Sequence, residues 1–479
     1  MMSVFNPCKK KHGIRFLVVL IGVAFINACA VGPDYKRPTS VVPASFTQAT
    51  PAEFSQSSIE VSWWRLFQDQ QLTTLVEQSI QHNYDLKTAR ANLQEARALY
   101  LQTGLNLTPT ITSHANYTDQ VRSTGALNNR AFVPRGLKLY NLGFDASWEV
   151  DFFGRLRRNI EASNDEVDAQ EASLRDLSVS LIAEVARNYF ELRGLQNQLA
   201  IEQKNIANQT QTFNITRAKI ENGRGTEQDS ASALAQLEAA KAGIPSLNSA
   251  IQRTIHRLSV LNGQQPGMLT QKLAQPAPLP TLPTRINIST PAELLRRRPD
   301  IRIAERTLAA STARIGVATA DLFPRVTFVG SIALEATSLV GLGAAGSDAY
   351  ALGPRISWAA FDLGRVLARM KAADAHAEAD LAKYQQTVLN ALEETENALV
   401  TYNQECSRQQ RLAAAAKASQ RAQQLAQARY DAGASDFQTL LNADARLLQD
   451  QNQLSQSQTT VATALTALYK ALGGGWAAL

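Results

Sequence analysis

The side chains that could do catalytic chemistry are scattered through this 479-residue chain and form no motif. The five histidines stand at positions 12, 82, 114, 256 and 376, without a His-x-x-x-His pair, which argues against a metal site. A Gly-x-Ser-x-Gly turn and a phosphate-binding P-loop are also missing from the sequence. Adjacent carboxylates such as Glu393 and Glu394 fall in a long helical pattern, where a solvated face is the ordinary expectation. The sequence therefore predicts neither an enzyme nor a metal protein.

Cys29 is the residue whose surroundings predict a chemical modification. A basic segment is followed by an apolar run from Phe16 to Ile26 that is too short to span a bilayer, which is typical of a signal peptide at residues 1–28. Residues 26–29, Ile-Asn-Ala-Cys, resemble a lipobox, although Asn27 departs from the usual small or apolar residue. We expect an N-acyl diglyceride on Cys29 and no other cofactor. The alternative is an ordinary secreted chain cut nearby, with Cys29 left as a thiol.

Cysteine content and charge limit the remaining classes of protein. Cys8 would leave with the signal peptide, so Cys406 is the only thiol that follows Cys29 and no disulfide framework is expected. The formal charge of +6 includes four cations of the signal segment, which leaves a mature charge of about +2. That charge is too small to indicate a nucleic-acid partner. Ala30, directly after Cys29, is not the aspartate typical of inner-membrane retention, so an outer-membrane location is expected.

The second half of the chain repeats the first. Residues 83–86 match 298–301 and Pro109 matches Pro324 at an offset of 215, whereas Trp148 matches Trp358 and residues 261–263 match 471–473 at an offset of 210. Each offset stays constant on its side of one short segment, which chance similarity would not do. We therefore predict a duplicated fold whose second copy has one shorter connection.

Both copies predict the same order of elements: a helix, two strands, a very long helix, a tight turn and another helix. The helices are expected at 70–105, 155–221 and 227–262 in the first copy, and at 291–321, 365–431 and 436–472 in the second. A helix of about 67 residues would be about 100 Å long, which is typical of coiled coils and helical arrays. Recurrent alanines at 368–382 and 413–428 favour close helix packing, although a solvated rod would also fit. Asp85 and Asp300 are predicted to cap helices.

The strand segments indicate a membrane. From Tyr140 to Val150 apolar and polar residues alternate, and the second copy repeats this pattern around Trp358 and from Val326 to Leu334. About ten residues with one apolar face suit a tilted membrane strand, although a small soluble sheet on a helical base remains an alternative. Because the smallest membrane barrels have about eight strands, four strands must be completed by two, three or more copies of the chain.

These features resemble the outer-membrane factor (TolC-like) family of tripartite efflux pumps, in its lipoprotein NodT/OprM-like branch. The resemblance rests on the duplicated plan, on Trp-Glu-Val-Asp-Phe-Phe-Gly-Arg at 148–155, on Arg-Arg-Pro-Asp-Ile-Arg at 297–302 and on Arg-Tyr-Asp-Ala-Gly at 429–433. It implies a mainly α-helical protein with a transmembrane β-barrel, in which a trimer forms a 12-stranded barrel above a 12-helix tunnel. The implied partners are outer-membrane lipid, a periplasmic adaptor and an inner-membrane pump of the resistance-nodulation-division (RND) class.

The resemblance also assigns roles to the two tight turns at 221–225 and 431–435. In this family such turns lie at the periplasmic tip, where the adaptor docks. Any helical hairpin needs a glycine at a reversal, so the glycines also have a purely structural explanation. The residues implied in docking are Gly223, Arg224, Gly225, Gly433, Ala434 and Ser435.

Family members further carry acidic rings at a closed tip. Asp229 corresponds to such a position, and three symmetric copies would attract cations, although a solvated charge in the first turn of a helix is the alternative. Asn442 stands where relatives often have aspartate, which weakens a gate in the second copy. Asp436 is a third gate candidate, but the N-cap of the last helix is its simpler explanation.

The predicted function is the exit duct of an RND-type efflux system in the outer membrane, which passively conducts drugs or other small toxic compounds to the exterior. A metal-ion efflux or type I secretion duct stays open, as does, less favoured, a structural periplasmic lipoprotein or adaptor. Adaptors, however, lack paired amphipathic strands repeated at a fixed offset.

The sequence also predicts the segments of the chain. A signal peptide at 1–28 is followed by an anchored extended segment at 29–62 and by a first repeat at 63–275, with strands at 108–123 and 139–151. A proline-rich linker at 276–290 leads to a second repeat at 291–473, with strands at 325–339 and 349–362, and to a tail at 474–479.

Overall fold

The computed structural model describes residues 30–39, 42–47, 54–55, 57, 59–125, 134–283 and 285–476. The predicted signal peptide and Cys29 lie outside the described residues, as do the last three residues of the predicted tail. The chain divides into two compact units, and each unit takes segments from both halves of the sequence. The first contains residues up to 38, 93–170 and 304–384, and the second contains 39–92, 171–303 and 385–479.

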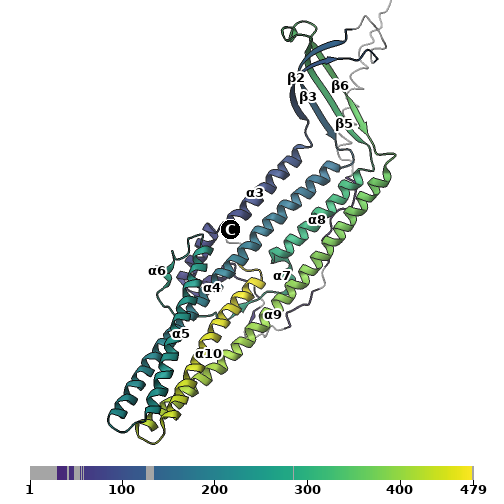
Figure 1. Ribbon diagram of the computed structural model, residues 1–479. Helices are drawn as coiled ribbons and strands as arrows, with labels where there is room; N and C mark the ends of the chain where they lie inside the picture. The colour runs from purple at the N-terminus through teal and green to yellow at the C-terminus, as the bar shows by residue number, and fades with distance from the viewer. Residues whose placement is uncertain are drawn as a thin grey trace, which may run out of the picture. The chain divides into compact units, whose positions relative to one another are not determined.

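A four-stranded antiparallel sheet belongs to the first unit (Figure 1). Its order is β2 (Thr110–Val121), β3 (Gly136–Val150), β5 (Arg325–Ala336) and β6 (Asp348–Ser357). Strand β6, the second strand of the second repeat, is shorter than the predicted 349–362. The chain leaves the strand after residue 357 and turns at residues 358–362, before the next helix begins. A short 3-10 helix, η4 (Leu339–Gly341), lies in the β5–β6 connection.

The register of this sheet gathers the apolar residues on one face. Phe144 is paired with Ser113 and Ile332, and Ile332 is paired with Tyr350. Because side chains alternate along a strand, paired residues share a face. In the single chain this face is open to the surroundings: Ile332 is 71% exposed, Tyr350 83% and Leu352 82%. A large apolar face of this kind requires a partner or a lipid environment.

Helices α3 (Tyr84–Leu105), α4 (Arg155–Glu221), α8 (Pro299–Ala320) and α9 (Leu363–Asp431) contribute to both units. In the first unit, the described segment from Ala30 onward is held against α4, where Arg158 bonds Asp34 at 2.6 Å and the carbonyl oxygen of Val31 at 3.2 Å. Arg306 of α8 bonds Asp165 of α4 at 3.0 Å. These ion pairs join the helices of the two copies to one another and to the N-terminal segment.

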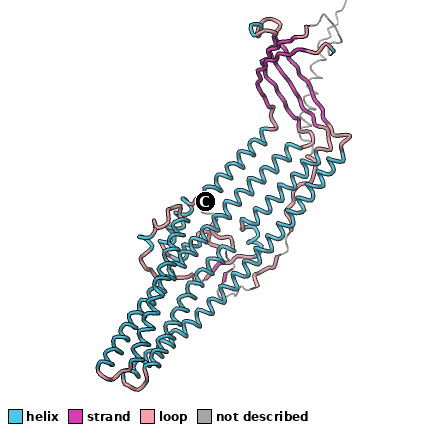
Figure 2. The backbone as a smooth tube through the Cα atoms, viewed as in Figure 1, coloured by secondary structure: helices cyan, strands magenta, loops and turns pink. Residues whose placement is uncertain are grey.

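The second unit contains two helical hairpins, α4 with α5 (Glu227–Leu261) and α9 with α10 (Phe437–Ala471), which lie side by side and turn at the same end (Figures 1 and 2). Shorter elements surround the other end of the hairpins. They are β1 (Phe54–Ser55) paired in parallel with β4 (Ile286–Asn287), η2 (Trp63–Phe67), α2 (Gln70–His82), α6 (Thr270–Leu273) and α7 (Pro291–Arg297).

An aromatic core fixes η2 in the second unit. Trp63 is buried and stacks on Tyr469 with ring centroids 5.0 Å apart, and Phe67 packs on Phe190 at 4.8 Å. Large buried aromatic side chains contribute much of the packing energy of such a core. Trp63 and Phe67 thus tie η2 to α10 and α4.

The predicted order of helix, strand, strand, long helix and helix is confirmed in both copies, but two predicted helix boundaries are wrong. The helix expected at 70–105 is broken at Asn83 into α2 and α3, because the Asn83 side chain accepts hydrogen bonds from the backbone N–H groups of Asp85 (2.8 Å) and Leu86 (3.1 Å) and so starts a new helix. The helix expected at 291–321 is broken before Pro299, since a residue that precedes proline disfavours helical geometry.

The predicted capping roles of Asp85 and Asp300 are also wrong. Asp85 lies inside the first turn of α3, and the cap is Asn83. Asp300 lies in the first turn of α8 and binds the guanidinium of Arg298 at 2.7 Å. None of the described helices is both long enough and apolar enough to cross a membrane.

Candidate functional site

Two turns of near-identical geometry close the hairpins of the second unit. In the first, the N–H groups of Gly223 and Arg224 donate to the carbonyls of Ile220 and Lys219, both at 2.8 Å. In the second, Gly433 and Ala434 donate to Tyr430 at 3.0 Å and Arg429 at 2.8 Å. This pair of bonds is the Schellman motif, which satisfies the last carbonyls of a helix.

Backbone conformation explains the glycine at each turn. Gly223 has φ of 68° and Gly433 has φ of 69°, a left-handed region that strains other residues. A Cβ at either position would meet no described atom within 4 Å, so the space around both turns is open. Gly225 differs, because a Cβ there would lie 3.0 Å from the backbone nitrogen of Ile220. The glycines thus shape the turns and leave their outer side free for a partner.

The helices that follow the turns begin with capped first turns. Thr226 accepts a hydrogen bond from the N–H of Asp229 at 3.2 Å, and Asp436 accepts one from the N–H of Thr439 at 2.7 Å. The side-chain hydrogen bond from Thr439, followed by the backbone one, lowers the pKa of Asp436 from its ordinary value. Asp436 is therefore the N-cap of α10.

The remaining gate candidates lie at different depths in the two hairpins. Asp229 is in the first turn of α5, three residues after its cap, whereas Asn442 is six residues after the cap of α10. Asn442 accepts a hydrogen bond from Gln438 at 3.0 Å and is exposed. These two residues therefore do not occupy matched positions of the duplicated hairpins.

Sequence reasoning missed the apolar cluster that joins the two hairpins near their turns. Tyr430 of α9 packs on Phe437 of α10 with ring centroids 5.5 Å apart, and the Lys219 ammonium of α4 lies 3.8 Å from the Tyr430 ring centroid. The spacing of Phe437, Leu440 and Leu441 on one helix face could have predicted it. The buried members are Ala233, Ala426, Phe437, Leu440 and Leu441.

Polar contacts join α4 to α10 farther from the turns. Gly194 packs directly on the side chain of Thr459, and Asn197 donates to Ser455 at 2.8 Å. Burial raises the pKa of the Glu202 carboxyl, an effect that hydrogen bonds from Asn452 and Asn205 partly offset. The two repeats of the chain are thus in close contact here, and that contact is largely polar.

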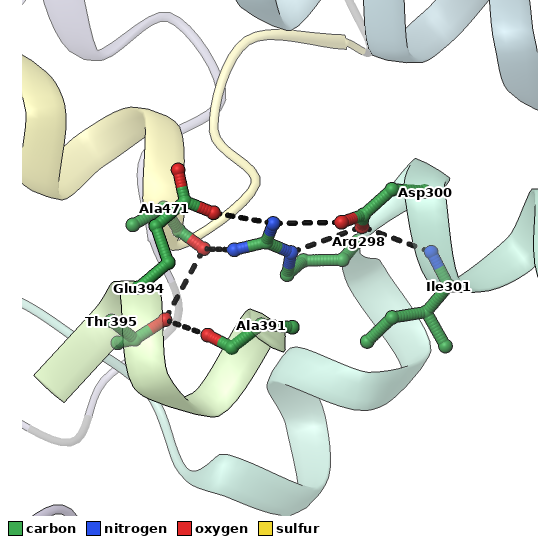
Figure 3. Close-up of polar contacts among 7 residues, drawn as sticks. All are labelled: Arg298, Asp300, Ile301, Ala391, Glu394, Thr395 and Ala471. Atoms are coloured by element: carbon green, nitrogen blue, oxygen red, sulfur yellow. Dashed lines mark hydrogen bonds and ion pairs between the residues drawn. The ribbon is translucent and has the colours of Figure 1, made fainter. Parts of the chain in front are cut away.

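At the other end of the hairpins, the residue directly before α3 or α8 binds the last carbonyl of the final helix of the same repeat. Asn83 donates to the carbonyl of Leu261, the last residue of α5, at 3.0 Å. At the matched position, Arg298 donates to the carbonyl of Ala471, the last residue of α10, at 2.7 Å (Figure 3). Such bonds satisfy carbonyl groups that a helix end leaves free.

The sheet of the first unit carries a second matched pair. The indole nitrogen of Trp148 donates to the carbonyl of Leu107, and that of Trp358 donates to the carbonyl of Leu322, both at 2.9 Å. On the polar face, Asn141 bonds both His114 at 2.6 Å and Glu335 at 2.7 Å, which links β2, β3 and β5. The strands β2 and β6 each have one partner among the described strands, so both edges of the sheet are open.

In the described part of the chain, no group of three His, Cys, Asp or Glu side chains is arranged to hold a metal ion.

Ala30, the residue after Cys29, packs on Gly154, and Val31 donates to the carbonyl of Phe153 at 3.1 Å. The described chain thus begins at the junction between β3 and α4.

Comparison with known proteins gives one consistent relationship. The model of the "Outer membrane efflux protein" family matches residues 75–264 and 290–474. Nodulation protein T of Rhizobium leguminosarum is 30% identical over 453 residues, which cover 94% of this chain and 95% of that protein. The cation efflux system protein CusC of Escherichia coli is 28% identical, with 98% and 99% covered. The solved structure of the outer-membrane channel OprN is 41% identical, covers 94% of this chain and 100% of its own, and has a TM-score of 0.87.

Proposed function

The chain belongs to the outer membrane efflux protein family, and from this premise we propose that three copies close an exit duct in the outer membrane. The observation that carries the proposal is the sheet with one apolar face and two open edges. An open edge within lipid would leave backbone groups unsatisfied at a cost of several kcal/mol each. Pairing β6 of one copy with β2 of the next, three times, gives a closed barrel of about twelve strands.

The two faces of the sheet fit the two environments of such a barrel. Ile332, Tyr350 and Leu352 would contact lipid, and the polar chain of His114, Asn141 and Glu335 would line a water-filled bore. Each chain would supply the two hairpins α4–α5 and α9–α10 to a periplasmic tunnel. Helices of 67 and 69 residues suit a wall about 100 Å long.

The turns at Gly223 and Gly433 are the proposed docking surface for a periplasmic adaptor. Their outer side is open, and the backbone there is fixed by matched hydrogen bonds, so a partner would meet the same rigid shape six times around a trimer. Arg224 adds a cation to the first turn, whereas the matching position of the second turn holds the small, uncharged Ala434, followed by Ser435. An inner-membrane pump of the RND class would act through that adaptor.

Asp229 is the proposed constriction residue, because three copies near the tip would attract cations. Asp436 has no part in this proposal, since it caps α10. Asn442, which carries no charge, would at most narrow the bore. An acyl group on Cys29 would fix the membrane side of the β3–α4 junction, because Ala30 is packed there against Gly154.

Cargo is the least constrained part of the proposal. We favour drugs or other small toxic compounds, which a wide duct can conduct without a binding site. Metal ions are the second candidate, because a protein named for cation efflux is nearly as similar to this chain as one named for nodulation. Type I secretion is a third cargo route for the same duct.

The decisive experiment isolates outer-membrane fractions and compares heated with unheated samples in a denaturing gel. We expect a trimer that dissociates on heating, and the purified trimer should conduct ions across a planar bilayer. Monomeric protein in the soluble fraction, or a trimer without conductance, would contradict the proposed duct and favour a structural lipoprotein.

A further inference from the structure

The two edge strands of the sheet, β2 and β6, come from different repeats. β2 and β5 are the first strands of their repeats, and β3 and β6 are the second strands. Inside the chain β3 pairs with β5, so the second strand of one repeat is bonded to the first strand of the other. In the proposed barrel, β6 and β2 of the next chain are again a second strand and a first strand of different repeats. The β3–β5 contact therefore predicts how the seam, meaning the contact of β6 with β2 of the next chain, is built.

The strand register follows the duplication residue by residue. First strands of the two repeats correspond at the offset of 215, and second strands correspond at the offset of 210. Thr110 is paired with Ser147 in the first repeat. Their counterparts in the second repeat, Arg325 and Ser357, are also paired, and every other β5–β6 pair has its counterpart among the β2–β3 pairs. The two offsets thus transfer a strand register from one repeat to the other without a shift.

Applied to the seam, the β3–β5 register predicts which residues lie opposite each other. Asn141 is paired with Glu335, and the counterparts of these two residues are Ala351 and Gln120. We propose that β6 pairs with β2 of the next chain in this register, so that Ala351 of one chain lies opposite Gln120 of its neighbour. The inference rests on the proposed duct and goes beyond it, because the closure of a barrel alone leaves the register open.

Backbone hydrogen bonds support this register. The N–H of Glu335 donates to the carbonyl of Ser347 at 2.7 Å. The N–H of Arg122 donates to the carbonyl of Arg135 at 2.8 Å. Because successive residues of a strand bond to opposite sides, the odd-numbered residues of β6 bond to β5 and the even-numbered residues of β2 bond to β3. The seam is left with the backbone groups of even-numbered β6 residues and odd-numbered β2 residues. The proposed register sets these two groups opposite each other, whereas a shift by one residue would not.

Side chains favour the same register. It places Ile356 opposite Ala115, and both residues belong to the apolar face of the sheet. On the same face it places Pro354 opposite Tyr117. A shift by one residue would set these apolar side chains against the polar face of the neighbouring strand. The nitrogen of Pro354 points toward the seam, so the proline costs the chain no bond to β5 and removes one donor from the seam. A proline in this position is typical of an edge strand.

Cysteine pairs on the polar face of the seam test the register. The full chain carries Cys406→Ser, because Cys406 is the free cysteine of the described residues. Opposite residues that exchange no backbone hydrogen bonds have Cα atoms about 4.5 Å apart, which a disulfide can bridge. Residues displaced by two positions are about 7–8 Å apart, beyond the reach of a disulfide. Ala351→Cys combined with Gln120→Cys should therefore give, after mild oxidation, a covalent trimer that survives heating without reductant. Each cysteine alone should give monomers after heating.

Two displaced pairs are the matched controls. Ala351→Cys combined with Thr118→Cys, and Ala351→Cys combined with Arg122→Cys, should both run as monomers after heating. Arg355→Cys combined with Asn116→Cys is a second opposite pair, which should link if the first pair disturbs assembly. Linkage in a displaced pair, or unheated trimers that link in neither opposite pair, would overturn the register and leave the duct standing. A complete lack of trimers before heating would contradict the duct and the register together.

Discussion

The side-chain amide of Asn83 donates a 3.0 Å hydrogen bond to the carbonyl oxygen of Leu261, 178 residues later in the chain. The oxygen of the same amide accepts from the N–H groups of Asp85 and Leu86. One buried side chain therefore ends α5 and begins α3. This double role explains why the chain breaks its first helical pattern at a residue with modest helix propensity.

Replacing Asn83 with alanine should lower the free energy of unfolding by about 2 kcal/mol, because a buried carbonyl and two helix N–H groups lose their partner. Thermal melting followed by the helical circular dichroism signal measures this. Asn222→Ala is the matched control: Asn222 follows α4, is exposed and donates to the carbonyl of Ala218 in the last turn of that helix, so its loss should stay within about 0.5 kcal/mol. Equal losses in the two variants would disprove the role of Asn83.

Ile332→Lys should abolish stable insertion of the trimer, because a charge on the lipid-facing side of a barrel costs about 2–4 kcal/mol per copy. Ser331→Lys, one residue away on the opposite face of β5, should be tolerated. Heat-modifiable trimers in outer-membrane fractions report on both. In a soluble sheet an exposed isoleucine could become lysine without harm, so a normal Ile332→Lys trimer would refute a lipid-facing surface.

Gly223→Leu should form trimers that insert normally but should lose efflux, because a bulky side chain fills the open side of the turn. The left-handed backbone adds a local cost of about 1–2 kcal/mol. Drug susceptibility of cells and a pull-down of the adaptor measure the effect. Gly223→Asn, which tolerates this conformation with a smaller side chain, should retain part of the function. Full efflux by the leucine variant would exclude docking at this turn.

Glu202→Gln should raise the melting temperature at neutral pH. Burial raises the pKa of Glu202, so the ionised carboxylate is disfavoured in the folded protein. The stability that Glu202 contributes is complete below its ordinary pKa and is lost as pH rises through the raised value. The advantage of glutamine should therefore shrink as the pH falls. A glutamine variant that melts lower than wild type at neutral pH would show that the carboxylate charge is needed.

Periodicity and duplication were enough to predict the long helices, the turns and the four strands. Helices α4 and α9 end at Glu221 and Asp431, as their patterns indicate, since a glycine follows within two residues. The break at Asn83 was missed although the cap that causes it is local, since the Asn83 side chain accepts from the N–H groups of Asp85 and Leu86. What the local sequence could not indicate is the bond from Asn83 to a carbonyl group 178 residues away. Pro299 marks the break between α7 and α8 in the sequence. The helical pattern on both sides of Pro299 nevertheless favoured the prediction of one continuous helix.

At the candidate site, contacts between residues close in the sequence could be predicted, and contacts between distant residues could not. The capping role of Asp436 was predicted, because a cap depends on residues three positions apart. The contact of Lys219 with Tyr430 and the ion pair of Arg298 with Glu394 were missed, because each joins helices that are far apart in the sequence. A single sequence contains no signal for such pairs apart from the duplication itself.

The joints at Asn83 and Arg298 use a main-chain oxygen as acceptor, which has a consequence for the tolerance of each joint to substitution. Leucine occupies the acceptor position in one repeat and alanine in the other, and the bond is made in both. The side chain at the acceptor position therefore does not decide whether the bond forms. The chemistry of each joint is set by its donor alone, so the two repeats can differ there without a matching substitution at the acceptor.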